Sequence, residues 1–144
     1  MKKSINKNLL TVVGLGYVGL PLAVEFSKKV KTAGIDISKK KIIDLKKRKI
    51  SGDNIDIKSL KYLKKIHFTT EPRILKKSKY IIVGVPTPIN QDKNPNLKPL
   101  IKACKMIGNN LTKNTYIIFE STVYPGMTEE ICIPILEKFS KLKW

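Results

Sequence analysis

A turn with three regularly spaced glycines near the N-terminus constrains the fold of this chain more than any other feature. The apolar run Leu9–Val13 leads directly into the turn, and apolar residues at helical spacing follow it from Leu20 onward. A continuous apolar run is typical of a strand buried in a parallel sheet. In a strand–turn–helix unit of this kind, the first glycine makes the tight turn, the second lets the backbone approach a pyrophosphate, and the third lets the helix pack on the strand. The glycines at these three places are Gly14, Gly16 and Gly19.

An acidic residue supports a dinucleotide site, because a glycine pattern alone is weak evidence. The pyrophosphate would lie against unpaired N–H groups at the start of the helix, where the helix dipole also favours negative charge. A carboxylate about 20 residues later, at the end of a second strand, would then accept hydrogen bonds from the adenosine ribose. The segment Thr32–Ile37 is predicted to be that strand, and Asp36 closes it. The alternative is that Asp36 is a turn or helix N-terminal carboxylate.

The charge of Asp36 also predicts which dinucleotide binds. A carboxylate at this place accepts the ribose hydroxyls of NAD and repels the 2′-phosphate of NADP. The lysines at positions 39–41 could weaken that preference. We therefore expect NAD as the cofactor.

The length of 144 residues suits one domain, so we expect residues 1–144 to form a single domain, which the glycine turn and Asp36 predict to bind NAD. No apolar run approaches the roughly 20 residues of a membrane span, and no signal-peptide core follows the N-terminal lysines, so we expect a cytoplasmic protein with no membrane partner. The net charge is +18, but only two of the 29 basic residues are arginines. Specific nucleic-acid sites favour arginine forks and stacked aromatics. We therefore interpret the lysines as solvated surface and expect no specific nucleic-acid partner.

The cysteines and the single histidine do not predict a metal site. Cys104 and Cys132 lie inside helical patterns and lack metal-ligand spacing, so we expect two buried thiols and no disulfide. His67 lies in a short strand-like segment with no nucleophile or acid specified near it. We expect it to be a structural or exposed strand residue.

The order of the apolar segments predicts the fold class. Strand-like and helix-like segments alternate, which implies right-handed crossovers and a parallel sheet. We predict an α/β fold with a Rossmann-type, doubly wound parallel sheet that lacks its last strand, because no sixth strand follows the final helix-like segment. The predicted strands are Leu9–Val13, Thr32–Ile37, Ile66–Thr69, Tyr80–Val85 and Thr115–Phe119.

Capping and breaking residues delimit the predicted helices in the first half of the chain. Ser38 can cap a helix over Lys39–Lys49, and Gly52-Asp53-Asn54 breaks it. A weaker and very basic helical stretch is predicted at Lys58–Lys65.

Two further helices are predicted in the second half. Beyond the polar loop Asn90–Pro95, Asn96 can cap a helix with an apolar stripe. The last helix opens at Thr128, and Pro134 lies too deep within it to be accommodated freely. We therefore expect a kink or a late start there.

Distinctive residues follow the fourth and fifth predicted strands, at the carboxyl ends where parallel α/β sheets bind ligands. Pro86-Thr87-Pro88 follows the fourth strand and Glu120–Gly126 follows the fifth. Short hydroxyl side chains there suit ribose, phosphate or a bound water, although turn residues without a ligand would show the same pattern. These residues are Thr87, Ser121 and Thr122. Glu120 is placed to act as a base, or else to close a strand beside the cofactor.

Three segments together resemble a known family. They are Gly14–Ala23, Val85–Ile89 and Glu120–Glu130. In this order they resemble the N-terminal NAD-binding domain of the UDP-glucose/GDP-mannose dehydrogenase family, over roughly residues 8–140. The Tyr124-Pro125-Gly126 form is most similar to members that act on UDP-N-acetylgalactosamine or UDP-N-acetylglucosamine, the UDP-N-acetylhexosamine 6-dehydrogenases of surface-polysaccharide synthesis.

The resemblance implies a chemistry and a set of cofactor residues. Full-length members oxidise the C6 alcohol of a nucleotide sugar to a carboxylate, pass two hydrides to two NAD molecules and use a cysteine thioester. Carried over by motif, Thr122 would help to position the catalytic water. The residues that would bind or line NAD are Gly14, Gly16, Tyr17, Val18, Gly19, Asp36, Val85, Pro86, Thr87, Glu120, Ser121 and Thr122.

Several parts of the family pattern have no counterpart in these residues. They include the Ser-Pro-Glu-Arg segment with a catalytic glutamate, the substrate-binding lysine and asparagine, the nucleophilic cysteine, and the central region through which full-length members dimerise. Asn96 stands where an aspartate is usual, and Gly84 where a threonine is common. The resemblance therefore implies UDP-sugar binding only together with the family's C-terminal half.

We expect the NAD-binding part of a nucleotide-sugar dehydrogenase, with no turnover from the chain alone. The alternatives are a stand-alone NAD-binding or regulatory module, an inert fragment, or the Rossmann domain of a 6-phosphogluconate or 3-hydroxyisobutyrate-type dehydrogenase. The last is disfavoured, because those classes place residues other than Glu120–Glu130 after the fifth strand.

Overall fold

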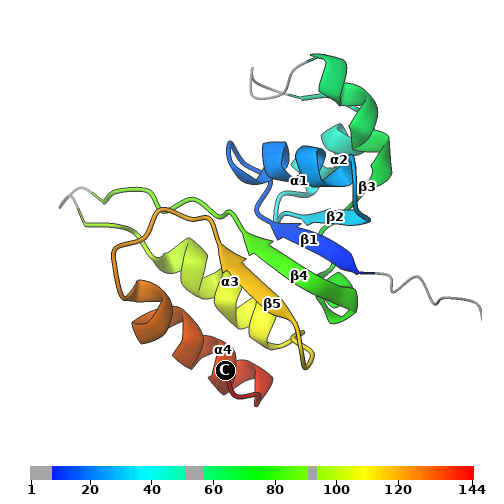
Figure 1. Ribbon diagram of the computed structural model, residues 1–144. Helices are drawn as coiled ribbons and strands as arrows, with labels where there is room; N and C mark the ends of the chain where they lie inside the picture. Colours follow the sequence, from blue (N-terminus) through cyan, green and yellow to red (C-terminus); the bar gives the residue numbers. More distant parts are fainter. Residues whose placement is uncertain (1–7, 51–56, 91–93) are drawn as a thin grey trace, which may run out of the picture.

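A parallel sheet forms the centre of the computed structural model, which describes residues 8–50, 57–90 and 94–144. The sheet has five strands in the order β3-β2-β1-β4-β5 (Figure 1). Every neighbouring pair is parallel, so all carboxyl ends lie at one edge. The expected Rossmann-type α/β class is confirmed. The strands are β1 (Leu9–Val13), β2 (Thr32–Ile35), β3 (Ile66–Thr69), β4 (Ser78–Val83) and β5 (Tyr116–Phe119).

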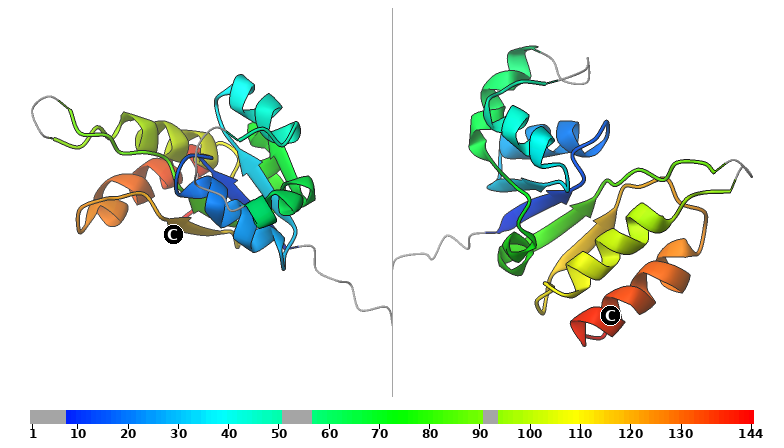
Figure 2. Two further views of the ribbon diagram at one scale, coloured as in Figure 1. Left: turned by 90° about the horizontal axis from the view of Figure 1, so that it is seen from above. Right: turned by 180° about the vertical axis from the view of Figure 1, so that it is seen from behind.

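Helices cover both faces of the sheet. They are α1 (Gly19–Ser27), α2 (Lys39–Lys46), η1 (Ile57–Lys65), η2 (Pro72–Lys77), α3 (Lys98–Gly108), η3 (Thr128–Cys132) and α4 (Ile133–Ser140). α1, α2 and η1 pack on one face, and α3 and α4 on the other (Figure 2). Because side chains alternate along a strand, Leu10 and Val12 of β1 enter the first core and Val13 enters the second.

Among the described residues, helices cover the edge strand β5 on one face only. Ile117 and Phe119 pack toward α3 and α4. Tyr116 and Ile118 are exposed on the opposite face of the sheet. The helices on that face, α1, α2 and η1, do not extend over β5 (Figure 1). Tyr116 stacks on Tyr80 of β4 with ring centroids 5.4 Å apart.

Several predicted boundaries are wrong by a few residues. β4 begins at Ser78 rather than Tyr80, because the Ser78 hydroxyl is hydrogen-bonded to the buried Thr11 hydroxyl at 2.7 Å, a pairing that an apolar pattern does not reveal. It ends at Val83 rather than Val85. The first predicted helix after β2 ends at Lys46, and Arg48 adopts a left-handed φ of 58° just beyond it.

The strand ends at β2 and β5 also differ from the prediction. β2 ends at Ile35, because the Asp36 carboxylate accepts the Ser38 N–H at 2.9 Å and so turns the chain out of the sheet. β5 begins at Tyr116, one residue after its predicted start.

The predicted helix cap at Ser38 is confirmed, and the predicted cap at Asn96 is shifted by one residue. The Ser38 hydroxyl accepts the Lys41 N–H at 3.2 Å and so caps α2. Asn96 acts from one residue further out than predicted. α3 begins at Lys98 with Leu97 at the N-cap, and Asn96 Oδ1 accepts the Lys98 N–H at 3.1 Å.

The basic helical stretch before β3 is 3₁₀ rather than α-helical. Lys61 lies three and four residues before Lys64 and Lys65. Like charges at these spacings would lie side by side on an α-helix and destabilise it. The predicted break at Gly52-Asp53-Asn54 lies outside the described residues, as does the centre of the Asn90–Pro95 loop.

The expectations for Pro134, the cysteines and His67 are confirmed. A π-helical turn, η3, precedes α4, and Pro134 falls in the first turn of α4, which is the predicted late start. Cys104 and Cys132 are free and buried. His67 is an exposed residue of β3.

The described residues contain neither a candidate membrane-spanning helix nor a candidate metal-ion cluster. None of the helices there combines the length and the apolar character that crossing a membrane requires. The same residues contain no cluster of three or more histidine, cysteine, aspartate or glutamate side chains suited to a metal ion.

Candidate functional site

The glycine turn between β1 and α1 is held by contacts that only glycine permits. Gly14 has a φ of +89°, in the left-handed region, and its N–H donates to Ile35 C=O at 2.9 Å. A Cβ atom added to Gly19 would lie 1.7 Å from the carbonyl oxygen of Gly14. The first turn of α1 therefore packs directly on the backbone that leaves β1.

Gly16, the middle glycine, differs from the other two. A Cβ atom added there would meet no protein atom within 4 Å. The fold itself therefore does not require glycine at this position. Bare backbone facing open space beside a helix N-terminus is what a pyrophosphate needs for close approach.

Asp36 joins the end of β2 to the glycine turn. Its Oδ2 accepts the Leu15 N–H at 3.0 Å and the Lys41 ammonium at 2.8 Å, and its Oδ1 accepts the Ser38 N–H at 2.9 Å. The side chain is only 8% exposed. Burial alone would raise the pKa of Asp36, but the hydrogen bonds from Lys41, Ser38 and Leu15 outweigh burial and lower the pKa below its usual value.

The hydrogen bonds of Asp36 leave one acceptor position of its carboxylate free for a ligand. Each carboxylate oxygen has two lone pairs, so Oδ2 is filled by its two donors and Oδ1 retains one free position. One ribose hydroxyl could therefore bind without any rearrangement. A second would have to displace the Lys41 ammonium, whose side chain is 41% exposed and so free to move away.

Two hydroxyl hydrogen bonds join the loops that follow β4 and β5. Thr87 Oγ1 donates to the Thr122 carbonyl at 2.8 Å, and Ser121 Oγ donates to the Val85 carbonyl at 2.7 Å. We call Thr87 and Ser121 the loop latch. They extend the pairing of the strands, since Glu120 N–H also donates to Val83 C=O at 2.9 Å. Their hydroxyl protons are thus committed to the backbone, while their oxygens can still accept.

The structure brings the predicted residues into two groups that meet at Gly84. The first group is the glycine turn with Asp36, and the second is the latched pair of loops. A Cβ atom on Gly84 would lie 3.2 Å from Gly19 Cα, so the end of β4 packs closely on the glycine turn. This close contact favours a small residue at position 84.

The predicted residues differ in exposure. Ser121 is buried, and Val85 and Thr87 are half-buried. The side chains that are exposed are those of Tyr17, Val18, Pro86, Glu120 and Thr122.

Sequence reasoning missed three groups that lie at or next to Asp36. The Leu15 N–H and the Ser38 N–H are backbone groups, which no residue pattern reveals. Ile37, which follows Asp36 directly in the chain, is an apolar side chain that is 93% exposed. Its place just after the acidic residue is the only signal for it in the sequence.

A parallel sheet of this strand order, with a glycine cradle at the end of β1 and a carboxylate at the end of β2, defines a dinucleotide-binding domain of the Rossmann class. The residues present fit such a cofactor, because Gly16 exposes bare backbone and Asp36 keeps an acceptor position free.

The comparison of sequences then identifies the family. The chain belongs to the UDP-glucose/GDP-mannose dehydrogenase family, whose NAD-binding domain matches residues 8–144. The expected family and the expected cofactor, NAD, are confirmed. The alternative, a 6-phosphogluconate or 3-hydroxyisobutyrate-type domain, is therefore not the one to which this chain belongs.

Similar proteins agree with this assignment. The chain is 50% identical over 135 residues to a UDP-N-acetyl-D-glucosamine 6-dehydrogenase of Pseudomonas aeruginosa, covering 94% of this chain and 32% of that protein. It is 46% identical over 138 residues to Protein CapL of Staphylococcus aureus, covering 96% and 32%. Among solved structures, an NDP-N-acetyl-D-galactosaminuronic acid dehydrogenase from Methanosarcina mazei Go1 superposes with a TM-score of 0.87 at 29% identity, covering 95% and 32%. The chain thus spans about a third of the length of these relatives.

Proposed function

We propose that this chain is the NAD-binding part of a UDP-N-acetylhexosamine 6-dehydrogenase of surface-polysaccharide synthesis. Such an enzyme oxidises the sugar C6 alcohol to the uronic acid and uses two NAD per sugar. The open backbone at Gly16, between two glycines that the fold requires, supports the NAD site, and the 50% identity to a UDP-N-acetyl-D-glucosamine 6-dehydrogenase supports the substrate class. We further propose that it acts in the cytoplasm as one domain over residues 1–144.

Each group of residues has a proposed role in holding NAD. The pyrophosphate would lie along the backbone of Gly14–Gly19 and the first turn of α1, where partial positive charge gathers. Asp36 would accept an adenosine ribose hydroxyl at Oδ1, and Ile37 would contact the adenine. The latched loops would flank the nicotinamide end, with exposed Thr122 and Glu120 facing the reacting sugar.

The chemistry divides between the cofactor and the protein. NAD accepts the hydride from the sugar alcohol. The role proposed for Thr122 is to hold a water by its hydroxyl, while the Thr87 hydroxyl fixes the Thr122 backbone at 2.8 Å. Glu120 is exposed and close by in sequence, so it can accept a proton from that water or from the substrate.

Neither cysteine of the chain is suited to form the thioester. Cys104 and Cys132 are 0% and 1% exposed inside the core that α3 and α4 cover. The adjacent Cys132 thiol and burial both raise the pKa of Cys104 well above its usual value. We therefore propose that turnover, UDP-sugar binding and dimer formation need the two thirds of the family that lie outside this chain's match.

The chain is expected to bind NAD more tightly than NADP. The ionised Asp36 would repel a 2′-phosphate, while Lys41 would partly offset that repulsion because its ammonium lies 2.8 Å from the same carboxylate. Calorimetric titration of the 144-residue chain with NADH and NADPH measures both affinities. Replacing Lys41 by methionine should widen the ratio in favour of NADH. Tighter NADPH binding by the unmodified chain would contradict the proposal.

Removing one hydroxyl of the loop latch is expected to loosen the loop that holds Thr122. Thr87→Val keeps the side-chain size but loses the 2.8 Å hydrogen bond to the Thr122 carbonyl, so we expect a loss of about 1 kcal/mol in the free energy of unfolding. Amide hydrogen exchange near Thr122 should quicken without any cofactor. Thr112→Val is the matched control, since it removes a hydroxyl contact of 3.1 Å to Thr115 at the far end of β5. Unchanged amide hydrogen exchange near Thr122 in Thr87→Val would show that the loop latch does not hold this loop in place.

A further inference from the structure

Exposed lysines gather where the strands of the sheet begin, at the edge opposite the cofactor site (Figure 1). Because the strands are parallel, each connection returns the chain to this edge before the next strand starts. None of the segments that lead into β2, β3, β4 and β5 contains an acidic residue; they are residues 28–31, 57–65, 72–77 and 109–115. We call their exposed lysines the basic edge: Lys28, Lys29, Lys31, Lys61, Lys64, Lys65, Lys76, Lys77 and Lys113.

The opposite edge has a different charge pattern. The segments that leave β2, β3 and β5 contain Asp36, Glu71 and Glu120. Helix dipoles favour positive side chains at helix C-termini, which accounts for the lysines in the last turns of η1 and η2. They do not account for Lys31 and Lys113, which lie outside the helices. The domain is therefore electrically polar, with its positive charge away from the cofactor site.

Three lysines of the basic edge converge on one aromatic ring. The Nζ atoms of Lys28, Lys61 and Lys65 lie 5.4, 5.3 and 5.1 Å from the centroid of the half-buried Tyr62 ring. The ring face attracts each ammonium, but the three like charges repel one another. In the part of the chain that the structure describes, Lys28 alone of the three has a carboxylate partner, Glu25. An anion bound here would relieve a repulsion that the protein leaves uncompensated.

Exposed apolar side chains lie close in sequence to the same lysines. Val30, between Lys29 and Lys31, is 42% exposed, and Phe26 in the last turn of α1 is 38% exposed. Basic residues over anionic headgroups and apolar side chains that enter the headgroup boundary are the two contributions to peripheral membrane binding. A nucleic acid would use the lysines alone, and lysine lacks the planar fork that favours arginine in specific nucleic-acid sites.

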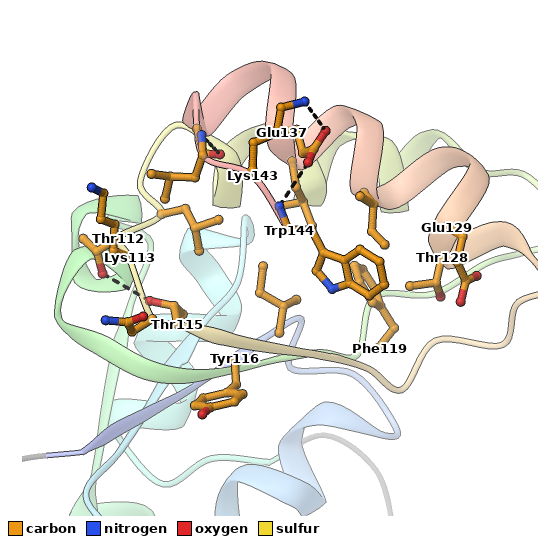
Figure 3. Close-up of a pocket in the computed structure, with 17 residues that line it drawn as sticks. Thr112, Lys113, Thr115, Tyr116, Phe119, Thr128, Glu129, Glu137, Lys143 and Trp144 are labelled. Carbon is orange, nitrogen blue, oxygen red and sulfur yellow. Dashed lines mark hydrogen bonds and ion pairs between the residues drawn. The ribbon is translucent and has the colours of Figure 1, made fainter.

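The β5 end of the basic edge is less positive than the α1 end. Lys113 lines a groove of about 650 Å³ between β5 and α4 (Figure 3). Glu137 lines the same groove and pairs with Lys143 at 3.2 Å. The uncompensated charge is therefore greatest around Tyr62, between the end of α1 and η1.

We propose that the basic edge, centred on Tyr62, docks the domain on the surface of an anionic lipid bilayer. The lysines would lie over the headgroup phosphates, and Val30 would reach into the headgroup boundary. Because the glycine turn and Asp36 lie at the opposite edge of the sheet, the cofactor site would face the solvent in the docked state. The proposal replaces the expectation of no membrane partner, which considered spanning segments only, and it does not rest on the proposed function.

The test is sedimentation of the 144-residue chain with lipid vesicles. The chain should bind phosphatidylcholine vesicles that contain about one third phosphatidylglycerol, and should not bind vesicles of phosphatidylcholine alone. Binding should be lost as the salt concentration rises from about 0.1 M to about 1 M, because exposed charges are then screened. Amide exchange at residues 28–31 should slow on the anionic vesicles, and exchange at residues 120–127 should not change.

A triple variant, Lys28→Gln, Lys61→Gln and Lys65→Gln, removes the converging charges and keeps most of each side chain. A lysine near an anionic surface strengthens binding roughly fivefold. The partition coefficient onto the anionic vesicles should therefore fall by roughly 100-fold.

Two further variants separate position and lipid contact from net charge. Lys98→Gln, Lys102→Gln and Lys138→Gln together remove the same charge from exposed sites on α3 and α4, so vesicle binding should fall by about threefold or less. Val30→Ser should weaken vesicle binding by about threefold without changing its salt dependence, because it removes an apolar contact and no charge.

Three results would overturn the proposal. They are no binding to the anionic vesicles at about 0.1 M salt, an equal loss of binding in the two triple variants, and tighter binding to duplex DNA that Val30→Ser leaves unchanged. The last result, measured by fluorescence anisotropy at the same salt concentration, would assign the basic edge to nucleic acid. NADH titration of the Lys28, Lys61 and Lys65 triple variant should give an unchanged affinity. Failure of the unmodified chain to bind NADH would count against the cofactor site only.

Discussion

Replacing Gly19 by alanine should disrupt both the fold and NAD binding. The added Cβ would lie 1.7 Å from the Gly14 carbonyl oxygen, and both partners are backbone atoms that cannot rotate away. We expect a loss of about 3 kcal/mol or more in the free energy of unfolding, at the upper end for an overpacked position. Urea denaturation measures the stability, and NADH titration of any folded fraction measures binding.

Gly16→Ala is the matched control. We expect it to weaken NADH binding while leaving stability nearly unchanged. An added Cβ there meets no protein atom within 4 Å, so stability should stay within about 1 kcal/mol of the unmodified chain, the range of helix and turn propensity differences. NADH affinity should nevertheless fall, because the methyl group would occupy the space of the pyrophosphate. Unchanged affinity in a stable Gly16→Ala protein would remove the cradle from the cofactor site.

Replacing Asp36 by alanine should weaken NADH binding by roughly 1–3 kcal/mol, or about 5- to 150-fold, the range of a charge-assisted hydrogen bond. The free position on Oδ1 is the acceptor that the ribose hydroxyl loses. Asp36→Asn keeps a neutral acceptor, so it should weaken NADH less and raise NADPH binding relative to NADH. Calorimetry with both nucleotides measures the two ratios.

The structural role of Asp36 must be separated from its binding role. Alanine also removes the hydrogen bonds to Leu15 and Ser38, so unfolding should be followed for each variant. Asp44→Ala, which removes another acid of the same segment, should leave NADH affinity unchanged. If Asp36→Ala bound NADH as well as the Asp44 control does, Asp36 would not lie in the site.

The pH dependence of NAD binding should follow the lowered pKa of Asp36. A group whose pKa is lowered in the folded state contributes stability above its usual pKa and loses it as the pH falls through the lowered value. Between pH 5 and 8 the carboxylate stays ionised. The contribution of Asp36 to NAD affinity should therefore be constant across that range and fall only in stronger acid.

Residue patterns predicted the elements that depend on local chemistry. The glycine spacing, the apolar run of β1 and the acid after β2 each follow from what a short segment can do by itself. The predicted helix cap at Ser38 and the late start caused by Pro134 belong to the same kind, since both depend on hydrogen bonds within a few residues.

Features that depend on distant residues could not be predicted in this way. The start of β4 at Ser78 depends on Thr11, 67 residues away, and the latch depends on Thr87 and Thr122, 35 residues apart. The Lys41 contact to Asp36 shares a carboxylate with a backbone N–H from the glycine turn, so sequence spacing could not reveal that it fills Oδ2.

The sequence by itself determined the dehydrogenase family and predicted a pyrophosphate cradle and an acid for ribose, because these depend on residue type at fixed spacing. Only the tertiary structure decided which glycines the fold requires and which one is left open for a ligand. It also decided that the hydroxyls of Thr87 and Ser121 are used to join two loops, and that β5 lies at one edge of the sheet that the described residues form. The physical reason is that steric contact, hydrogen-bond saturation and exposure are set by atoms that meet only when the chain has folded.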